Sequence, residues 1–217
     1  MTNDILLEAN DISHNFDYDL FKNVSFKIKN HSSLAILGKS GSGKSTLLSI
    51  LSSLLSPKSG EVNFLGRNLY KIKNKELLKI RREDFGIIFQ AHYLFRGFSA
   101  RENLKISSLL SKKELDYELL EKMDITKVLD LGVGDLSGGQ QQRLSVARIL
   151  SKKPKIIFAD EPSGNLDQEN SKNLMNILFD YVKYNDAALI LVTHENELPN
   201  FCDKIYKLEN LELKEIK

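Results

Sequence analysis

A glycine-rich stretch in the first quarter of the chain has the residue types and spacing of a phosphate-binding loop. It follows an apolar run at residues 34–37 and precedes a helical pattern that opens at Thr46. The glycines allow successive backbone N–H groups to turn toward phosphate oxygens, and the positive end of the following helix favours an anion. In this pattern Lys44 is expected to neutralise the β- and γ-phosphates of ATP, and the Ser45 hydroxyl to bind Mg²⁺. The predicted nucleotide-binding residues are Gly38, Lys39, Ser40, Gly41, Ser42, Gly43, Lys44, Ser45 and Thr46.

Two adjacent carboxylates, Asp160 and Glu161, end a second apolar run at residues 156–159. Ligands of parallel sheets collect at the carboxyl edge of the strands, where the phosphate loop is also expected. Asp160 is therefore predicted to hold Mg²⁺, directly or through a water, and Glu161 to act as the general base on the attacking water. A strand that simply reaches solvent would be the better interpretation if the phosphate loop were missing.

Two further polar residues follow apolar runs and should reach the same edge of the sheet. His194 follows the strand predicted at residues 188–193, and its placement favours a contact with the γ-phosphate or with Glu161. Gln90 follows the run at residues 86–89, and its amide is predicted to reach Mg²⁺ or water. We interpret Gln90 as a hinge residue that senses the γ-phosphate. A lone histidine or a surface glutamine would ordinarily be structural.

A second glycine-containing segment precedes a helical pattern that Pro154 closes. Its central residues are Ser137, Gly138, Gly139 and Gln140. A serine and two glycines at a helix start offer N–H groups and a hydroxyl to an anion, which predicts another phosphate contact. Ser137 and Gln140 also have the spacing of a capping box, and both interpretations can hold together.

The apolar runs that precede these sites indicate the fold class. They lack polar alternation, which is typical of strands buried on both faces of a mostly parallel sheet. Residues 21–29 and 61–64 do alternate, which predicts an additional antiparallel β layer with one face in water. The expected class is therefore α/β, and the phosphate loop described above is typical of a P-loop NTPase core.

The middle of the chain has helix signals instead of strand signals. Ser99 with Glu102, and Ser111 with Glu114, have the capping-box spacing that marks a helix start. We therefore predict a single domain over residues 1–217. In it, residues 1–89 and 153–217 form the catalytic α/β core and residues 90–152 form an inserted α-helical subdomain.

The composition excludes several classes of protein. The 31 basic residues nearly balance the 29 acidic ones and are dispersed, so no nucleic-acid partner is expected. The lone Cys202 suits a reducing compartment. Asp4 and Glu8 interrupt the first apolar stretch, which does not read as a signal peptide. Apolar runs are far shorter than the ~20 residues of a membrane-spanning helix, so a role at a membrane requires a partner.

Taken together, the phosphate loop, the Asp160–Glu161 pair and the segment at residues 136–140 resemble the ATP-binding-cassette (ABC) transporter ATPases over essentially the whole chain. The resemblance implies that two copies form a dimer, in which the signature segment around Ser137 of one copy caps the ATP bound by the other. It also implies that Phe16 stacks on adenine, with Tyr18 as the alternative, and that residues 164–167 cross the dimer interface.

Within the family, residues 159–167 are similar to the branch that includes the lipoprotein-releasing, macrolide-export and cell-division cassettes, and residues 89–104 to lipoprotein-releasing cassettes in particular. The resemblance implies integral membrane subunits as partners and a position on the cytoplasmic face of the inner membrane. The aromatic residues of the segment at 89–98 lie where the family receives its membrane subunit. A cassette protein that acts on ribosomes or DNA is the remote alternative.

Overall fold

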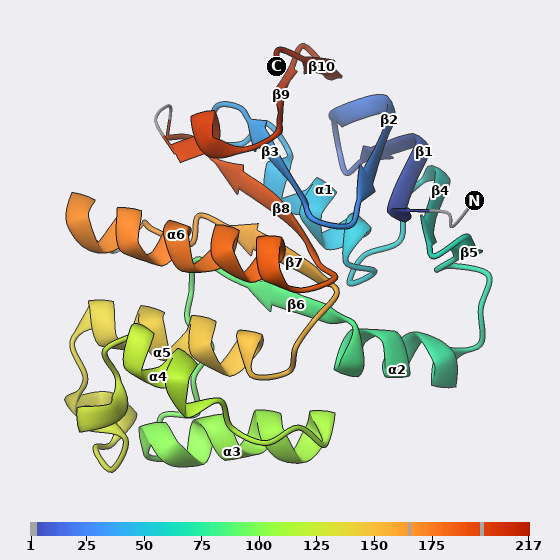
Figure 1. Cartoon of the computed structure of the whole chain (residues 1–217). Coiled ribbons are helices and arrows are strands. Elements are labelled where there is room, and N and C mark those ends of the chain that lie inside the picture. Colours follow the sequence, from blue (N-terminus) through green and yellow to red (C-terminus); the bar gives the residue numbers. More distant parts are fainter. Residues whose placement is uncertain (1–3, 165, 196–197) are drawn as a thin grey trace.

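The computed structural model describes residues 4–164, 166–195 and 198–217 of the chain, which form two β-sheets and several helices (Figure 1). One sheet has six strands in the order β10-β9-β3-β8-β7-β6, and the other has four in the order β2-β1-β4-β5. The α/β class predicted above is confirmed. The six-stranded sheet consists of β3 (Ser32–Leu37), β6 (Phe85–Ile88), β7 (Ile156–Asp160), β8 (Ala188–Thr193), β9 (Lys204–Glu209) and β10 (Glu212–Glu215).

The centre of this sheet is parallel. Strand β3 pairs in parallel with β8 and β9, and β7 pairs in parallel with β8 and β6. Each of the four predicted apolar runs lies in or overlaps one of these strands. Every residue of β8 is buried, as expected for a strand covered on both faces.

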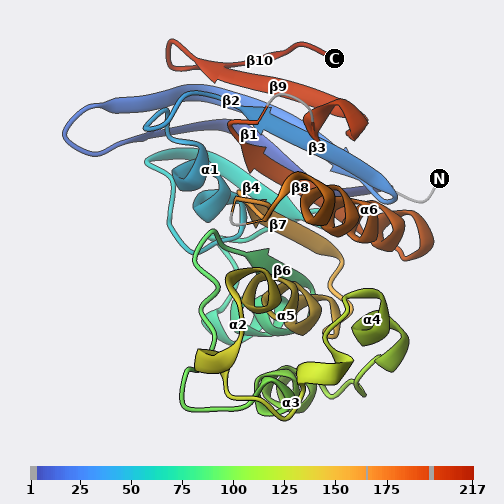
Figure 2. The same ribbon diagram turned by 90° about the vertical axis from the view of Figure 1, so that its left-hand side faces the viewer.

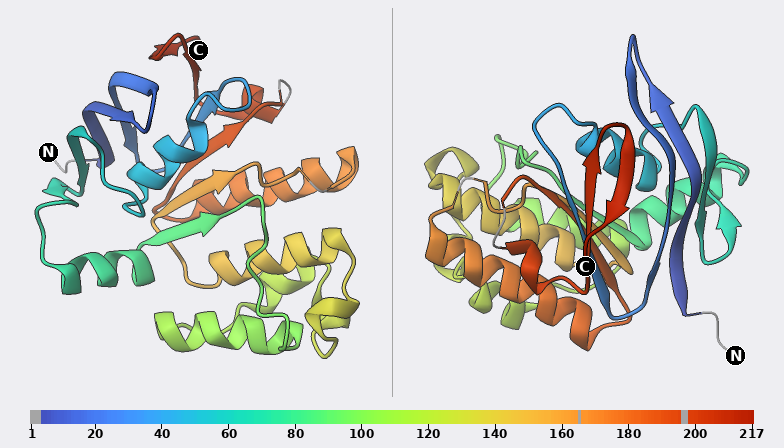
Figure 3. Two further views of the ribbon diagram at one scale, coloured as in Figure 1. Left: turned by 180° about the vertical axis from the view of Figure 1, so that it is seen from behind. Right: turned by 90° about the horizontal axis from the view of Figure 1, so that it is seen from above.

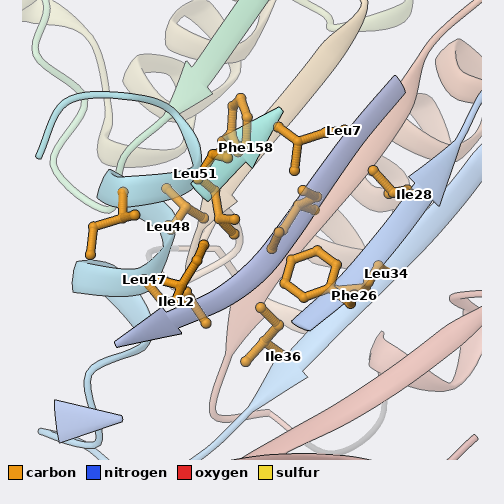
Figure 4. Close-up of a cluster of buried hydrophobic side chains, with 14 of the residues drawn as sticks. Leu7, Ile12, Phe26, Ile28, Leu34, Ile36, Leu47, Leu48, Leu51 and Phe158 are labelled. Carbon is orange, nitrogen blue, oxygen red and sulfur yellow. The ribbon is translucent and has the colours of Figure 1, made fainter. Parts of the chain in front are cut away.

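Alternate residues of the parallel strands face two separate cores. Leu34, Ile36 and Phe158 point to the first core, which also contains helix α1 (Lys44–Leu51) and the four-stranded sheet (Figure 4). Ala35 and Ala159 point to the second core, with α5 (Gly138–Leu150) and α6 (Gln168–Tyr184). This alternation follows from the two-residue period of a strand.

The antiparallel sheet covers the outer side of the first core. It consists of β1 (Ile5–Asn15), β2 (Asp19–Lys29), β4 (Ser59–Phe64) and β5 (Arg67–Asn68), all paired antiparallel. In β2 buried and exposed residues alternate over most of the strand, which confirms the predicted wet face. The β1–β2 hairpin extends beyond the rest of the sheet, and its turn contains Phe16 and Tyr18 (Figure 3).

Three helices between β6 and β7 gather on one side of the molecule, away from the antiparallel sheet (Figure 2). They are α3 (Ala100–Ser111), α4 (Tyr117–Lys122) and α5, with short 3-10 turns at Thr126–Val128 and Val133–Asp135. Helix α2 (Asn74–Glu83) leads into β6, and a 3-10 turn at Leu198–Phe201 precedes β9. Helices thus occupy the segment where they were predicted.

Two of the three helix starts follow the predicted capping signals. Ser99 and Ser137 both form complete capping boxes, with Glu102 and Gln140 respectively. The start predicted at Ser111 is wrong, because Ser111 ends α3 and the next residue has φ of 56°. Helix α4 begins instead after Asp116, whose side chain accepts a hydrogen bond from the Leu119 N–H. A single carboxylate cap suffices at that position.

Candidate active site

The phosphate loop turns between the end of β3 and the start of α1. Gly41 and Gly43 have φ of 78° and 95°, a region that side chains with a Cβ rarely adopt. Lys44 is buried, and its Nζ donates to the carbonyl oxygens of Gly38 at 2.8 Å and Lys39 at 3.0 Å. Its ammonium is thereby folded over the loop, where an incoming phosphate could take over from these carbonyls.

Asp160 and Ser45 lie side by side, although they come from β7 and from the start of α1. Burial raises the pKa of the Asp160 carboxyl, while a hydrogen bond from Ser45 and the charge of Lys44 act in the opposite direction. A carboxylate and a hydroxyl are oxygen donors of the kind that Mg²⁺ prefers, and Mg²⁺ is usually bound by one or two carboxylates plus substrate phosphates. The donor set therefore fits the predicted metal.

Glu161 is almost fully buried, and residues at the end of β8 hold its carboxylate in place. Oε2 accepts a hydrogen bond from the Thr193 hydroxyl at 2.8 Å. Oε1 accepts one from the His194 backbone N–H at 2.9 Å and lies 2.7 Å from His194 Nδ1. Because an ionised carboxylate only accepts, Nδ1 is the protonated nitrogen in this contact. The predicted contact of His194 with Glu161 is present in the structure.

Thr193 is the residue of this group that the sequence analysis missed. Its hydroxyl accepts a hydrogen bond from the Glu195 N–H at 3.1 Å while donating to Glu161, so it fixes both the carboxylate and the turn after β8. Its position directly before His194 was the available signal. Threonine at the end of a buried strand is, however, also typical of ordinary β-structure.

One pocket of about 560 Å³ brings together most of the residues predicted to act on a nucleotide. Phe16 and Tyr18 both line this pocket, and both are more than half exposed. Gln90 also reaches the pocket from the end of β6. The predicted residues that line it are Phe16, Ser40, Gly41, Gly43, Lys44, Ser45, Thr46, Gln90, Asp160, Glu161 and His194.

The predicted signature segment does not line this pocket in the same chain. Ser137 caps α5 and exchanges hydrogen bonds with Gln140, so its structural role is present. A Cβ at Gly139 would lie 3.2 Å from the Leu166 side chain, which places the segment beside the predicted interface loop. Within that loop, Asn165 lies outside the described residues.

Residues 21–164 match the family model described as ABC transporter. The chain belongs to the ABC transporter family. It is an ABC ATPase, and the matched residues include the phosphate loop, the segment around Ser137 and the Asp160–Glu161 pair.

Similar proteins come from more than one transport system. The chain is 35% identical to the lipoprotein-releasing system ATP-binding protein LolD of Buchnera aphidicola, covering 90% of this chain and 88% of that protein. It is 39% identical to the macrolide export ATP-binding/permease protein MacB of Bdellovibrio bacteriovorus, covering 88% of this chain but 30% of MacB. The chain is thus similar both to an ATP-binding protein of a lipoprotein-releasing system and to the ATP-binding part of a macrolide exporter.

A solved structure supports the fold at the scale of the whole chain. The ATP-binding cassette MJ0796, a dimer in a post-hydrolysis state bound to ADP and phosphate, superposes with a TM-score of 0.88 at 27% identity. The match covers 98% of this chain and 99% of MJ0796. Among the residues described for this chain, no helix is both long and apolar enough to cross a bilayer.

Proposed function

We propose that the chain is the ATP-hydrolysing subunit of an export complex and that two copies enclose two ATP molecules between them. The observation that supports this most directly is the pocket, which gathers groups suited to adenine, phosphate, a metal ion and water activation. The signature residues Ser137, Gly138, Gly139 and Gln140 are not part of its lining. A second copy would supply them, as the dimeric state of the MJ0796 cassette suggests.

Hydrolysis would proceed by in-line attack of water on the γ-phosphorus. Glu161 accepts a proton from the water as the new P–O bond forms, and the bond to the bridging oxygen breaks to release ADP. Lys44 neutralises charge on the β- and γ-phosphates, and His194 holds Glu161 in place. Ser45, Asp160 and Gln90 would hold Mg²⁺, which supplies further charge neutralisation when bound.

We further propose that residues 90–152 move as one helical subdomain relative to the core formed by residues 1–89 and 153–217. Gln90 stands where the first connection leaves the core and reaches into the pocket. A change in its contact with the metal ion or water would thereby be passed to the signature helix α5. This is the proposed hinge.

The surface that would receive a membrane subunit follows Gln90. Tyr93, Phe95 and Phe98 are 66%, 49% and 43% exposed, an unusual concentration of exposed aromatic rings in six residues. Phe89 packs edge-on against Tyr93, and Arg148 lies over the ring of Phe95. Part of this aromatic segment is therefore held by the protein, and part is free to dock against an apolar helix.

Release of lipoproteins from the bacterial inner membrane is the transport process that we favour, with the chain bound at the cytoplasmic face through its membrane subunits. The similarity to LolD over nearly the full length of both chains supports this choice. Export of a macrolide or peptide, as in MacB, is the second candidate, and a cell-division complex is the third. An action on ribosomes or DNA has no support in the dispersed basic charge.

Glu161→Gln tests the proposed hydrolytic mechanism. The amide keeps the size of the side chain but cannot accept the proton, so the steady-state hydrolysis rate should fall by a factor of about 10² to 10⁴. ATP should still bind, and the variant should elute as a dimer with ATP and as a monomer with ADP in size-exclusion chromatography. The matched control is Glu76→Gln, an exposed glutamate on α2. Hydrolysis at the wild-type rate would exclude Glu161 as the base.

Substitution of the exposed rings tests the proposed membrane partner. In Tyr93→Ser/Phe95→Ser the chain should retain its own ATPase activity but lose its attachment to membranes. Tagged wild type, purified from native membranes, should bring down an integral membrane protein with four spans and a large external domain. Equal recovery of this protein with the double variant would contradict the docking surface. Tyr184→Ser, an exposed ring on α6, is the control.

A further inference from the structure

A buried histidine lies behind the pocket, next to the aromatic residue proposed to stack on adenine. His14 is 4% exposed, and neither ring nitrogen has a hydrogen-bond partner within the described part of the chain. Its ring meets the ring of Phe16 edge-on, with centroids 4.9 Å apart and an interplanar angle of 82°. Such edge-to-face pairs are favourable and fix the orientation of both rings.

The other side of His14 leads to the phosphate loop. His14 pairs across the β1–β2 hairpin with Phe21, and the two rings are stacked at 6.4 Å. Phe21 is fully buried, and a Cβ at Gly43 would lie 3.2 Å from its ring. The order of contacts is therefore Phe16, His14, Phe21 and Gly43. His14 therefore lies between Phe16, the proposed adenine-stacking residue, and Phe21, which packs against the phosphate loop at Gly43.

We infer that His14 is a positioning residue for the Phe16 ring and that protonation of His14 weakens nucleotide binding. The inference rests on the proposed role of Phe16 as the adenine-stacking residue. The contact with His14 also distinguishes Phe16 from Tyr18, because a ring already held in one orientation loses less conformational entropy when a base stacks on it.

The environment of His14 favours the neutral ring. Burial lowers the pKa of His14, and the positive charge of Lys58 lowers it further. Lys58 precedes β4, and its N–H donates to the Ser13 carbonyl at 3.0 Å, so it is fixed near the histidine. The groups that β2 and the hairpin turn pack against His14 are the uncharged rings of Phe21 and Phe16. Lys58 is thus the charged group that acts on His14 among the described residues.

The sign of the effect on ATP follows from linkage. Protonation of a buried ring without hydrogen-bond partners is unfavourable, so we expect a protonated His14 to displace the Phe16 ring that packs against it. A base stacked on Phe16 would hold that ring in place and so oppose protonation of His14, and by reciprocity protonation would oppose stacking. ATP affinity should therefore fall as the pH drops below the ordinary histidine pKa of about 6.5.

The test compares ATP affinity at pH 7.5 and pH 5.5 in wild type and in His14→Phe, which keeps a ring but cannot titrate. Wild-type affinity should fall by about three- to tenfold more than that of the variant, since one pKa unit of linkage corresponds to tenfold. His14→Gln, which also cannot titrate, serves if the larger Phe disturbs folding. Because every variant retains His194, and ATP itself titrates equally in all samples, the difference reports His14.

Lys58→Met provides an independent readout. Removal of the positive charge should raise the pKa of His14, so the loss of ATP affinity should begin at a higher pH than in wild type. Equal pH dependence in wild type and His14→Phe would overturn the inference. Phe16→Ala tests the stacking role of Phe16 separately. If this variant bound ATP at pH 7.5 as tightly as wild type, Phe16 would not be the stacking residue, and the positioning role of His14 would be contradicted with it.

Discussion

Hydrogen bonds from the end of β8 hold the carboxylate of Glu161. Glu161 has φ of 47°, a left-handed conformation that costs energy in a residue with a Cβ, and its side chain turns back toward the end of β8. There the Thr193 hydroxyl and the His194 N–H and ring hold its two oxygens. The proposed base is therefore oriented by the protein.

Thr193→Val should separate this orienting role from nucleotide binding. Valine has the shape of threonine but no hydroxyl, so Glu161 Oε2 loses its partner while the buried strand remains packed. A hydrogen bond to a charged group contributes about 1.5–3 kcal/mol, and we expect kcat to fall by about tenfold with little change in ATP affinity. Steady-state kinetics and equilibrium binding measure the two quantities. Thr193→Ser, which keeps the hydroxyl, should restore most of kcat, and an inactive Ser variant would contradict the explanation.

At the scale of elements, the signature helix α5 ends where the helical segment rejoins the sheet. Lys152 lies at this junction, and its ammonium donates to the carbonyl oxygens of Arg81 and Phe85, at the end of α2 and the start of β6. Burial, and then the charge of Arg148, lower the pKa of Lys152 to about 8, while Asp84 acts in the opposite direction. Lys152 thus ties the return of the proposed helical subdomain to the end of α2 and the start of β6 in the core.

This contact predicts a specific pH dependence of stability. Between pH 8 and the unfolded pKa of about 10.4, unfolded chains keep a proton on Lys152 that folded chains have lost. The unfolded state then binds more protons than the folded state. The free energy of unfolding therefore rises with pH across this window, and the contribution of Lys152 to the rise is on the order of 2 kcal/mol. Urea unfolding of wild type and Lys152→Met at pH 7.5 and 10 should show the difference. The exposed neighbour Lys153→Met should follow wild type, and parallel behaviour of all three would refute it.

At the scale of the whole molecule, the proposed dimer places each ATP between the phosphate loop of one copy and the signature of the other. Lys44→Ala removes the loop cation, and Ser137→Arg puts a bulky side chain where the γ-phosphate of the partner's ATP would lie. In a mixed dimer with shared sites, one site has both defects and the other has neither.

Mixing these two variants in a Glu161→Gln background tests the shared sites. We expect mixed dimers that retain a single ATP, detected by native mass spectrometry, while neither variant alone forms a closed dimer. If each chain contained a whole site, every site in the mixture would have one defect and no closed mixed dimer would form. Glu161→Gln homodimers, with two ATP molecules, are the reference.

The sequence by itself determined the parts of the site that are contiguous. The phosphate loop, the Asp160–Glu161 pair and the Ser137 cap each lie within a few neighbouring residues, and their chemistry follows from local backbone geometry. The same holds for the class of fold, because a strand buried on both faces is an uninterrupted apolar run in the sequence. Helix α4 shows the limit of local signals, since the capping-box spacing at Ser111 does not open a helix, whereas Asp116 caps α4 without a capping box.

Only the tertiary structure decided which distant residues meet. The strand order β3-β8-β7-β6 brings the loop at Lys44, the carboxylates after β7, His194 after β8 and Gln90 after β6 to one edge, although they are spread over the chain. The hydrogen bond from Thr193 to Glu161 and the contact between the rings of His14 and Phe16 depend on strand pairing that no local pattern specifies. Such contacts join residues far apart along the chain or across a hairpin. Their geometry is fixed when the two cores pack, and they could not be predicted from the sequence alone.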